Sequence, residues 1–159
     1  MINVFCFGYG QVAKNFIKKL SEKNIEINLN FTSRKIKDKK IKNLSNAFNF
    51  NDDFYDPNII PELKKADYIL VSIPPVDGKD IVLKNFSGEF KNLKVKWITY
   101  LSATSVYGNH NGKWVDENSL TMPTSENGIN RLAAEKKWIS VCKKLNLPFQ
   151  IFRLSGIYS

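Results

Sequence analysis

Short apolar runs alternate with segments of helical spacing along most of the chain. Most of the runs are rich in β-branched and aromatic residues, which is typical of strands buried inside a sheet. The runs cover residues 2–7, 25–31, 47–50, 67–73, 95–101 and 149–154. This pattern predicts a strand at each of these places. The signal for a strand is weakest at residues 47–50.

Helical spacing fills the segments between these runs. Val12, Phe16 and Leu20 recur every four residues, with Ala13 and Ile17 beside them, and predict the first helix. The longest helix is expected over residues 128–145, and its apolar stripe comprises Ala134, Trp138, Val141, Cys142 and Leu145. Further helical segments are expected in the lysine-rich stretch before the strand at 47–50, between Pro61 and Lys65, and in part of residues 77–92. The segment 105–127 is rich in Gly, Asn, Ser and Pro and is typical of a functional loop.

This alternation of strands and helices decides the fold class. It predicts an α/β protein with a parallel sheet and right-handed crossovers, formed as one domain over residues 1–159. The expected architecture is a Rossmann-type doubly wound sheet with strand order 3-2-1-4-5-6. A nucleotide would then bind at the carboxyl ends of the strands, where the strand order reverses.

Composition narrows the class of protein further. A length of 159 residues with 43% hydrophobic residues allows one folded core. No apolar stretch approaches the ~18 residues of a membrane span, and Met1 leads into an apolar run without a basic segment before it. We therefore expect a cytoplasmic protein without membrane contacts. Cys6 and Cys142 are expected to be reduced packing residues, and no Cys/His spacing predicts a metal site.

The chain is basic, with a formal net charge of +9 from 24 Lys+Arg against 15 Asp+Glu. A basic surface attracts nucleic acid, anionic membranes or phosphorylated ligands. The densest cluster comprises Lys35, Lys37, Lys39, Lys40 and Lys42. It lacks the interleaved aromatic residues of a single-strand-binding surface, and lysine is abundant along the whole chain. Direct nucleic-acid binding is therefore disfavoured, although a basic interaction module stays open as an alternative function.

The segment after the first strand carries the sharpest motif. Residues 8–13, Gly-Tyr-Gly-Gln-Val-Ala, match the Gly-x-Gly-x-x-Gly/Ala pattern between a strand and a helix. Gly8 would form the tight turn, Gly10 would let a pyrophosphate approach the backbone, and Ala13 would let the helix pack closely. Gln11 and Val12 would present backbone amides to the phosphates. An ordinary glycine-containing turn is the alternative interpretation.

The end of the second strand bears on which dinucleotide is bound. NAD-specific domains carry an acidic residue here, about 20 residues after the turn, that binds the ribose 2′-hydroxyl. This chain instead has Ser33, Arg34 and Lys35. A serine hydroxyl, a bidentate guanidinium and an ammonium suit a 2′-phosphate, which favours NADP while leaving NAD possible. Alternatively, Arg34 and Lys35 simply belong to a solvated basic segment.

Several segments together resemble the short-chain dehydrogenase/reductase superfamily, in its extended, epimerase/dehydratase-like branch. The markers are the glycine turn, Ser-Ile-Pro-Pro at 72–75, Tyr-Leu-Ser-Ala-Thr-Ser-Val-Tyr-Gly at 100–108, Arg-Leu-Ala-Ala-Glu at 131–135 and Arg-Leu-Ser-Gly-Ile-Tyr at 153–158. The loop 108–117 resembles an atypical subgroup of uncharacterised NAD(P)-binding proteins. The resemblance implies that Ser72, Ile73 and Pro74 pass under the adenosine side, and that Ser102, Ala103 and Thr104 flank the nicotinamide.

The resemblance also implies where a catalytic Ser, Tyr and Lys would stand. Those positions fall on Ala103, Asn127 and Arg131, and none of the three reproduces the expected group. Alanine offers no hydroxyl, asparagine has no titratable proton, and arginine stays protonated. Standard acid/base catalysis beside hydride transfer is therefore not expected. The open alternatives are a hydroxyl from Ser102, Thr104 or Ser105 and a proton donor in Tyr107 or His110. Arg131 keeps the positive charge of the lysine position and stays a weak catalytic candidate.

Members of that superfamily continue beyond the segment that matches residues 153–158 into a C-terminal substrate region, which we expect to be missing here. A separate C-terminal half or self-association would then cover the surface it leaves. The favoured function is an NADP-binding, atypical member without standard catalysis. An active sugar-nucleotide epimerase, dehydratase or reductase, acting on an unknown small molecule and completed by a partner or a rearranged acid/base set, is the alternative.

Overall fold

One parallel sheet organises the computed structural model, which describes residues 1–34 and 45–156. Its strand order is β3-β2-β1-β4-β5-β6, which confirms the predicted doubly wound topology. The strands are β1 (Ile2–Phe7), β2 (Ile27–Ser33), β3 (Ser45–Asn49), β4 (Tyr68–Val71), β5 (Trp97–Ala103) and β6 (Phe149–Leu154). The α-helices are α1 (Gln11–Glu22), α2 (Ile59–Lys64), α3 (Ile81–Phe86) and α4 (Glu126–Lys144), with short 3-10 turns η1 (Glu89–Asn92) and η2 (Thr104–Val106).

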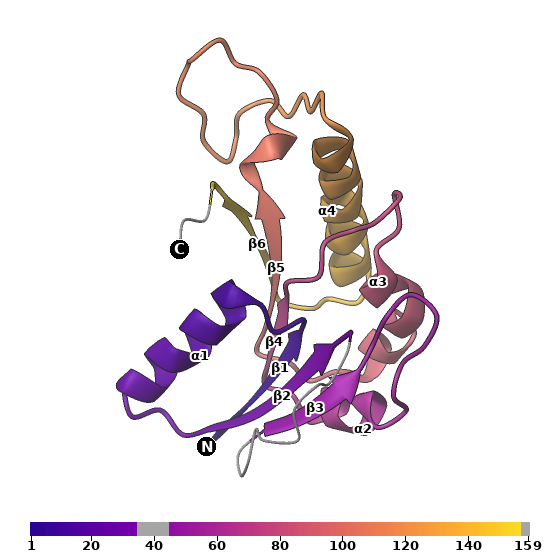
Figure 1. The fold of residues 1–159 in the computed structure, drawn as a ribbon. Coiled ribbons are helices and arrows are strands. Elements are labelled where there is room, and N and C mark those ends of the chain that lie inside the picture. Colours follow the sequence, from indigo (N-terminus) through magenta and orange to yellow (C-terminus); the bar gives the residue numbers. More distant parts are fainter. Residues whose placement is uncertain (35–44, 157–159) are drawn as a thin grey trace.

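The helices cover the two faces of the sheet unequally (Figure 1). Helix α1 packs on one face, whereas α2, α3 and α4 lie on the other. The larger core lies under those three helices, where Phe7 of β1 contacts Phe86 of α3, and Phe5 and Trp138 belong to the same cluster. A smaller cluster lies under α1 and contains the buried side chain of Ala13.

Two predicted strands are shifted by two residues in the structure. The second strand, expected at residues 25–31, runs from Ile27 to Ser33, and the fifth, expected at 95–101, runs from Trp97 to Ala103. Both shifts follow from pairing, because β2 is bonded to β1 and β3, and β5 is bonded to β4 and β6 as far as Ala103. The shift places Ser33 inside a strand rather than beyond it.

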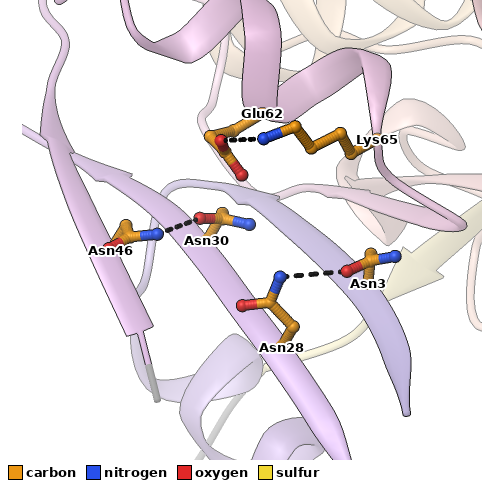
Figure 2. Close-up of polar contacts among 6 residues, drawn as sticks. All are labelled: Asn3, Asn28, Asn30, Asn46, Glu62 and Lys65. Carbon is orange, nitrogen blue, oxygen red and sulfur yellow. Dashed lines mark hydrogen bonds and ion pairs between the residues drawn. The ribbon is translucent and has the colours of Figure 1, made fainter. Parts of the chain in front are cut away.

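Strand β2 alternates apolar residues with asparagines, although it is an interior strand paired on both sides. Hydrogen bonds between asparagine side chains explain how these polar residues are accommodated. Asn28 donates a hydrogen bond to Asn3 across β1 and β2 at 2.9 Å, and Asn46 donates to Asn30 across β2 and β3 at 3.0 Å (Figure 2). Each pair stands opposite in the strand register. Asn30 is 2% exposed, so these lateral bonds satisfy amides that burial would otherwise make costly.

The predicted long helix starts two residues early, at Glu126. Ser125 caps it by accepting a hydrogen bond from the Gly128 amide at 3.1 Å. The predicted stripe is largely confirmed, since Ala134, Trp138 and Cys142 are buried. On α1 the prediction was partly wrong, because Ala13 is buried while Phe16 is 43% exposed.

Some expectations fall on residues that the structure does not describe. They are the lysine cluster at Lys35, Lys37, Lys39, Lys40 and Lys42, the short helix expected there, and the final residues of the 153–158 motif. Cys6 and Cys142 are free, buried thiols, and burial raises the pKa of each to about 12. Among the described residues, no helix combines the length and apolarity required to traverse a membrane.

Candidate functional site

The turn after β1 is held in place by two neighbouring strands. The Gly8 amide donates a hydrogen bond to Thr32 Oγ1 of β2 at 2.9 Å. Gly8 has a φ of +84°, and a Cβ there would lie 2.7 Å from Ser72 Oγ at the end of β4. The left-handed backbone and this close approach both require glycine. Ser72 is itself fixed, because its hydroxyl donates to the Phe7 carbonyl at 3.1 Å.

Gly10 leaves the amino end of α1 open. No atom lies within 4 Å of where its Cβ would be, so the second glycine faces open space rather than protein. Gly10 occupies the N-cap of this 12-residue helix, no side chain caps the helix, and no acidic residue lies in its first turn. The amides of Gln11, Val12 and Ala13 therefore lack partners within the helix and present the positive end of its dipole.

These elements border a groove of about 350 Å³ at the carboxyl edge of the sheet. The predicted residues that line it are Gly8, Gly10, Ser33, Arg34, Ser72, Ile73 and Pro74. The other lining residues are Tyr9, Thr32, Phe50, Asn51, Asp52, Val76 and Ile81, which the sequence did not single out for the site. The structure thus gathers ends of β1, β2 and β4 into one concave surface, as the predicted topology requires.

The groove carries charges of both signs beside β2. Arg34 is exposed at the rim and Ser33 is half-buried, and both follow directly on the buried Thr32. Asp52, from the segment after β3, lines the same groove. The sequence missed Asp52 because it lies 18 positions after Arg34, and only the pairing of β2 with β3 brings the two segments together.

The remaining predicted binding residues lie outside this groove. Gln11 is exposed at the start of α1, and the side chain of Val12 turns toward the sheet. Ser102 and Ala103 end β5. Ser102 is 3% exposed, and its hydroxyl has no hydrogen-bond partner within the described part of the chain. An unpaired buried hydroxyl is uncommon, and a ligand atom or water would satisfy it.

The three positions implied for catalysis are not assembled into an acid/base group. Ala103 has no polar side chain, and Asn127 is exposed in the first turn of α4. Arg131 donates from Nη1 to the Leu101 carbonyl at 2.7 Å, so its guanidinium is anchored to β5.

The other proton-transfer candidates have structural bonds of their own. The Tyr107 hydroxyl accepts a hydrogen bond from Arg153 Nη1 at 3.0 Å. Arg153 in turn donates two hydrogen bonds to the buried Glu135 carboxylate, from Nε at 3.1 Å and from Nη2 at 2.9 Å. These bonds raise the pKa of Arg153 above its usual range. His110 Nε2 lies 3.0 Å from the Leu120 carbonyl.

Thr104 and Tyr107 line a second pocket of about 440 Å³ beside the long loop. Asp116, Glu117 and Arg153 complete its polar lining. Among the described residues, no group of three or more His, Cys, Asp or Glu side chains is placed to hold a metal ion.

The loop over residues 108–122 is closed tightly at its base. Gly108 has a φ of +72°, and a Cβ there would overlap the Met122 carbonyl. The Met122 amide donates to the Tyr107 carbonyl at 3.2 Å. At the other end of the loop, the Trp114 side chain is fully exposed.

Comparisons of the sequence with protein-family models and with curated proteins find no match. Solved structures do match. A protein of unknown function from Silicibacter pomeroyi is 29% identical over 99% of this chain, with a TM-score of 0.79. UDP-glucuronic acid 4-epimerase from Bacillus cereus, solved with NAD, is 17% identical over 99% of the chain, also with a TM-score of 0.79. UDP-N-acetylglucosamine 4-epimerase from the same organism is 16% identical over 99%, with a TM-score of 0.77.

These matches establish the fold, and they cover 54%, 57% and 55% of the three neighbours. The chain therefore spans about half the length of the structures it resembles. The predicted resemblance to the extended short-chain dehydrogenase/reductase branch is confirmed at the level of the fold, because the two epimerase structures match 99% of the chain with TM-scores of 0.79 and 0.77.

Proposed function

We propose that this chain binds a dinucleotide, NADP in preference to NAD, and does so without Ser-Tyr-Lys catalysis. The observation that carries the proposal is the turn at residues 8–10. Gly8 is locked against Ser72 while Gly10 faces open space at the uncapped end of α1. A pyrophosphate would occupy that space and accept hydrogen bonds from the free amides of the first helical turn. The NAD named with the B. cereus epimerase supports the same class of ligand.

The rest of the ligand would follow the carboxyl edge of the sheet. The adenosine would lie toward β2 and β3, beside Arg34 and Asp52, because these residues border the groove there. The nicotinamide would lie toward β5, where the unpaired Ser102 hydroxyl is available to it. When bound, such a cofactor supplies or accepts a hydride. The groove of about 350 Å³ has a volume typical of small-molecule sites.

The preference for NADP rests on the end of β2. Arg34 is exposed at the rim of the groove, and a guanidinium binds a phosphate through two parallel hydrogen bonds. Asp52 acts in the opposite sense, since a carboxylate near the ribose would bind a 2′-hydroxyl and repel a 2′-phosphate. We favour NADP because Arg34 directly follows β2, beside which the ribose would lie, whereas Asp52 lies in the segment after β3.

A second candidate function is favoured by the position of Tyr107. Tyr107 lines the pocket with Thr104, and its hydroxyl accepts a bond from Arg153, so the hydroxyl proton is not used in that bond. An active epimerase, dehydratase or reductase with a rearranged acid/base set would use this group. Turnover of a nucleotide-sugar or carbonyl substrate that Tyr107→Phe abolishes, with unchanged nucleotide affinity, would establish this alternative.

The deciding experiment titrates the 159-residue protein with NADPH and with NADH. Nicotinamide fluorescence and thermal unfolding are followed together. We expect saturable binding with at least tenfold tighter NADPH, and stabilisation of about 2.7 kcal/mol at a concentration of 100 times Kd. Tighter binding of NADH than of NADPH would indicate that Asp52 binds the ribose 2′-hydroxyl instead. Binding of neither nucleotide would overturn the proposal, and salt-dependent RNA binding in its place would favour the basic interaction module.

A further inference from the structure

The sequence contains two Asn-Gly pairs, at residues 111–112 and 127–128, and the fold places them in different environments. In such a pair the backbone nitrogen of the glycine can attack the side-chain amide of the asparagine, because glycine has no Cβ to shield that nitrogen. The attack requires rotation of the backbone between the two residues and a nitrogen that is not engaged in a hydrogen bond. The structure meets these conditions at the first pair and not at the second.

The first pair forms a turn in the loop over residues 108–122, which extends away from the sheet (Figure 1). Asn111 and Gly112 have φ values of +53° and +75°, and both residues are exposed. One backbone hydrogen bond closes this turn, from the Lys113 amide to the His110 carbonyl at 3.1 Å. The Gly112 amide donates no hydrogen bond to any residue that the structure describes. Rotation between the two residues therefore has to break that one bond of the turn, and the attacking nitrogen is already free.

The second pair lies in the first turn of α4, where the same nitrogen is occupied. The Gly128 amide donates a hydrogen bond to Ser125 Oγ at 3.1 Å, as part of the helix cap. Gly128 is buried, and a Cβ at this position would lie 2.5 Å from the Ser105 carbonyl oxygen of η2. Rotation between Asn127 and Gly128 would therefore break the cap and disturb the packing of α4 on η2.

We propose that Asn111 is a site of spontaneous deamidation and that the fold protects Asn127 from the same reaction. The Gly112 nitrogen bonds to the side-chain amide carbon of Asn111, and its proton leaves with the displaced amide nitrogen as ammonia. The product is a five-membered succinimide ring. Water then opens the ring at either carbonyl carbon and leaves aspartate or isoaspartate at position 111. Water is the only co-reactant, and the inference does not depend on nucleotide binding.

Deamidation would change the charge and the backbone of the loop. Asp116 and Glu117 of this loop already line the pocket beside it, and the reaction adds another carboxylate to the same loop at position 111. Isoaspartate also inserts one extra carbon into the backbone of the turn. Because the Met122 amide bonds to the Tyr107 carbonyl at the base of the loop, the change stays local. The protein therefore becomes more acidic with age while its thermal unfolding temperature stays constant.

The test follows both Asn-Gly pairs in the 159-residue protein, folded and in concentrated urea, during incubation in mildly alkaline buffer. Peptide mass spectrometry measures deamidation at each pair, and electron-transfer fragmentation distinguishes isoaspartate from aspartate. In the folded protein we expect Asn111 to react at least about tenfold faster than Asn127, because an exposed turn opens at a lower free-energy cost than a packed helix start. In urea the two rates should become similar, because neither pair is then held by structure.

Two variants test the two environments separately. Asn111→Gln should remove the fast-forming acidic species and keep the thermal unfolding temperature, because attack on the longer side chain requires a six-membered ring. Ser125→Ala frees the Gly128 amide and should accelerate deamidation at Asn127 in the folded protein. Equal rates at the two pairs in the folded protein, or a ratio that urea leaves unchanged, would overturn the proposal. Aspartate without isoaspartate at position 111 would also overturn it, because direct hydrolysis by water yields no isoaspartate.

Discussion

The two halves of the carboxyl edge use their polar groups in opposite ways. Around β1 and β2, the first turn of α1 carries no side-chain cap and Gly10 faces empty space. Around β5 and β6, polar side chains bond to one another, with Arg153 bridging Glu135 and Tyr107. The glycine turn therefore keeps unused backbone donors, whereas the buried unpaired groups of the described residues are the Tyr100 and Ser102 hydroxyls of β5. This difference teaches that two halves of one sheet edge can differ in how far the fold itself satisfies their polar groups.

The largest expected effect is a loss of stability when the ion pair between Glu135 and Arg153 is broken. Glu135 is 1% exposed and neutralises Arg153 through two hydrogen bonds. Glu135→Ala should lower the free energy of unfolding by about 3–5 kcal/mol, because it strands a partly buried guanidinium. Chemical denaturation measures this, and Glu135→Gln should cost less because one acceptor remains. Reduced nucleotide affinity in a still-folded Glu135→Gln protein would show that the two halves are not independent.

Substitutions of the two glycines of the turn test the half of the edge around β1 and β2. Gly8→Ala should strain the fold by about 1–2 kcal/mol, because φ is +84° and the new Cβ would meet Ser72. Gly10→Ala is the matched variant: it should leave thermal unfolding unchanged, because nothing lies within 4 Å, yet weaken NADPH binding at least tenfold. Full affinity in Gly10→Ala would mean that no phosphate approaches this turn.

A smaller effect is expected at the rim of the groove. Arg34→Asp should remove the preference for NADPH over NADH, a change of at least tenfold or about 1.4 kcal/mol. Parallel fluorescence titrations of both nucleotides measure the ratio. Lys143→Asp makes the same charge change on α4 and should keep the ratio, which separates a local contact from the general field of the protein. An unchanged ratio in Arg34→Asp would argue against the phosphate contact.

The smallest effect concerns two aspartates whose titration should oppose one another. The hydrogen bond from the Asn3 amide lowers the pKa of Asp67, so its stabilisation exists above the unfolded pKa and disappears as pH falls through the folded value. Burial raises the pKa of Asp80, so its contribution is present at low pH and is lost as pH rises through the folded value.

Unfolding free energies measured between about pH 3 and pH 6 separate the two groups. Asp67→Asn should make stability rise less steeply with pH, and Asp80→Asn should make it rise more steeply. Changes of the same sign in both variants would contradict the assigned environments.

Local patterns predicted much of this architecture. The apolar runs at residues 2–7 and 149–154 match β1 and β6, and the glycine turn lies where the motif placed it. Thr32 and Asp52 were missed because their roles depend on neighbours distant in sequence, Gly8 for the first and the β2–β3 pairing for the second. Glu135 of α4 was not singled out as a site residue because its partner, Arg153, lies 18 residues later on β6. The available signal was that Glu135 directly follows Ala134, a member of the apolar stripe of α4.

The closed base of the 108–122 loop makes its tip a natural place for engineering. Tyr107 and Gly108 pair with Met122 and hold the two stems together, so we expect the tip near Trp114 to tolerate a change of length while β5 and α4 stay in place. The fully exposed Trp114 marks where an epitope, an affinity tag or a fluorescent label would project into solvent. A protein carrying such an insertion should keep its thermal unfolding temperature, which makes this loop a practical handle for immobilising the molecule.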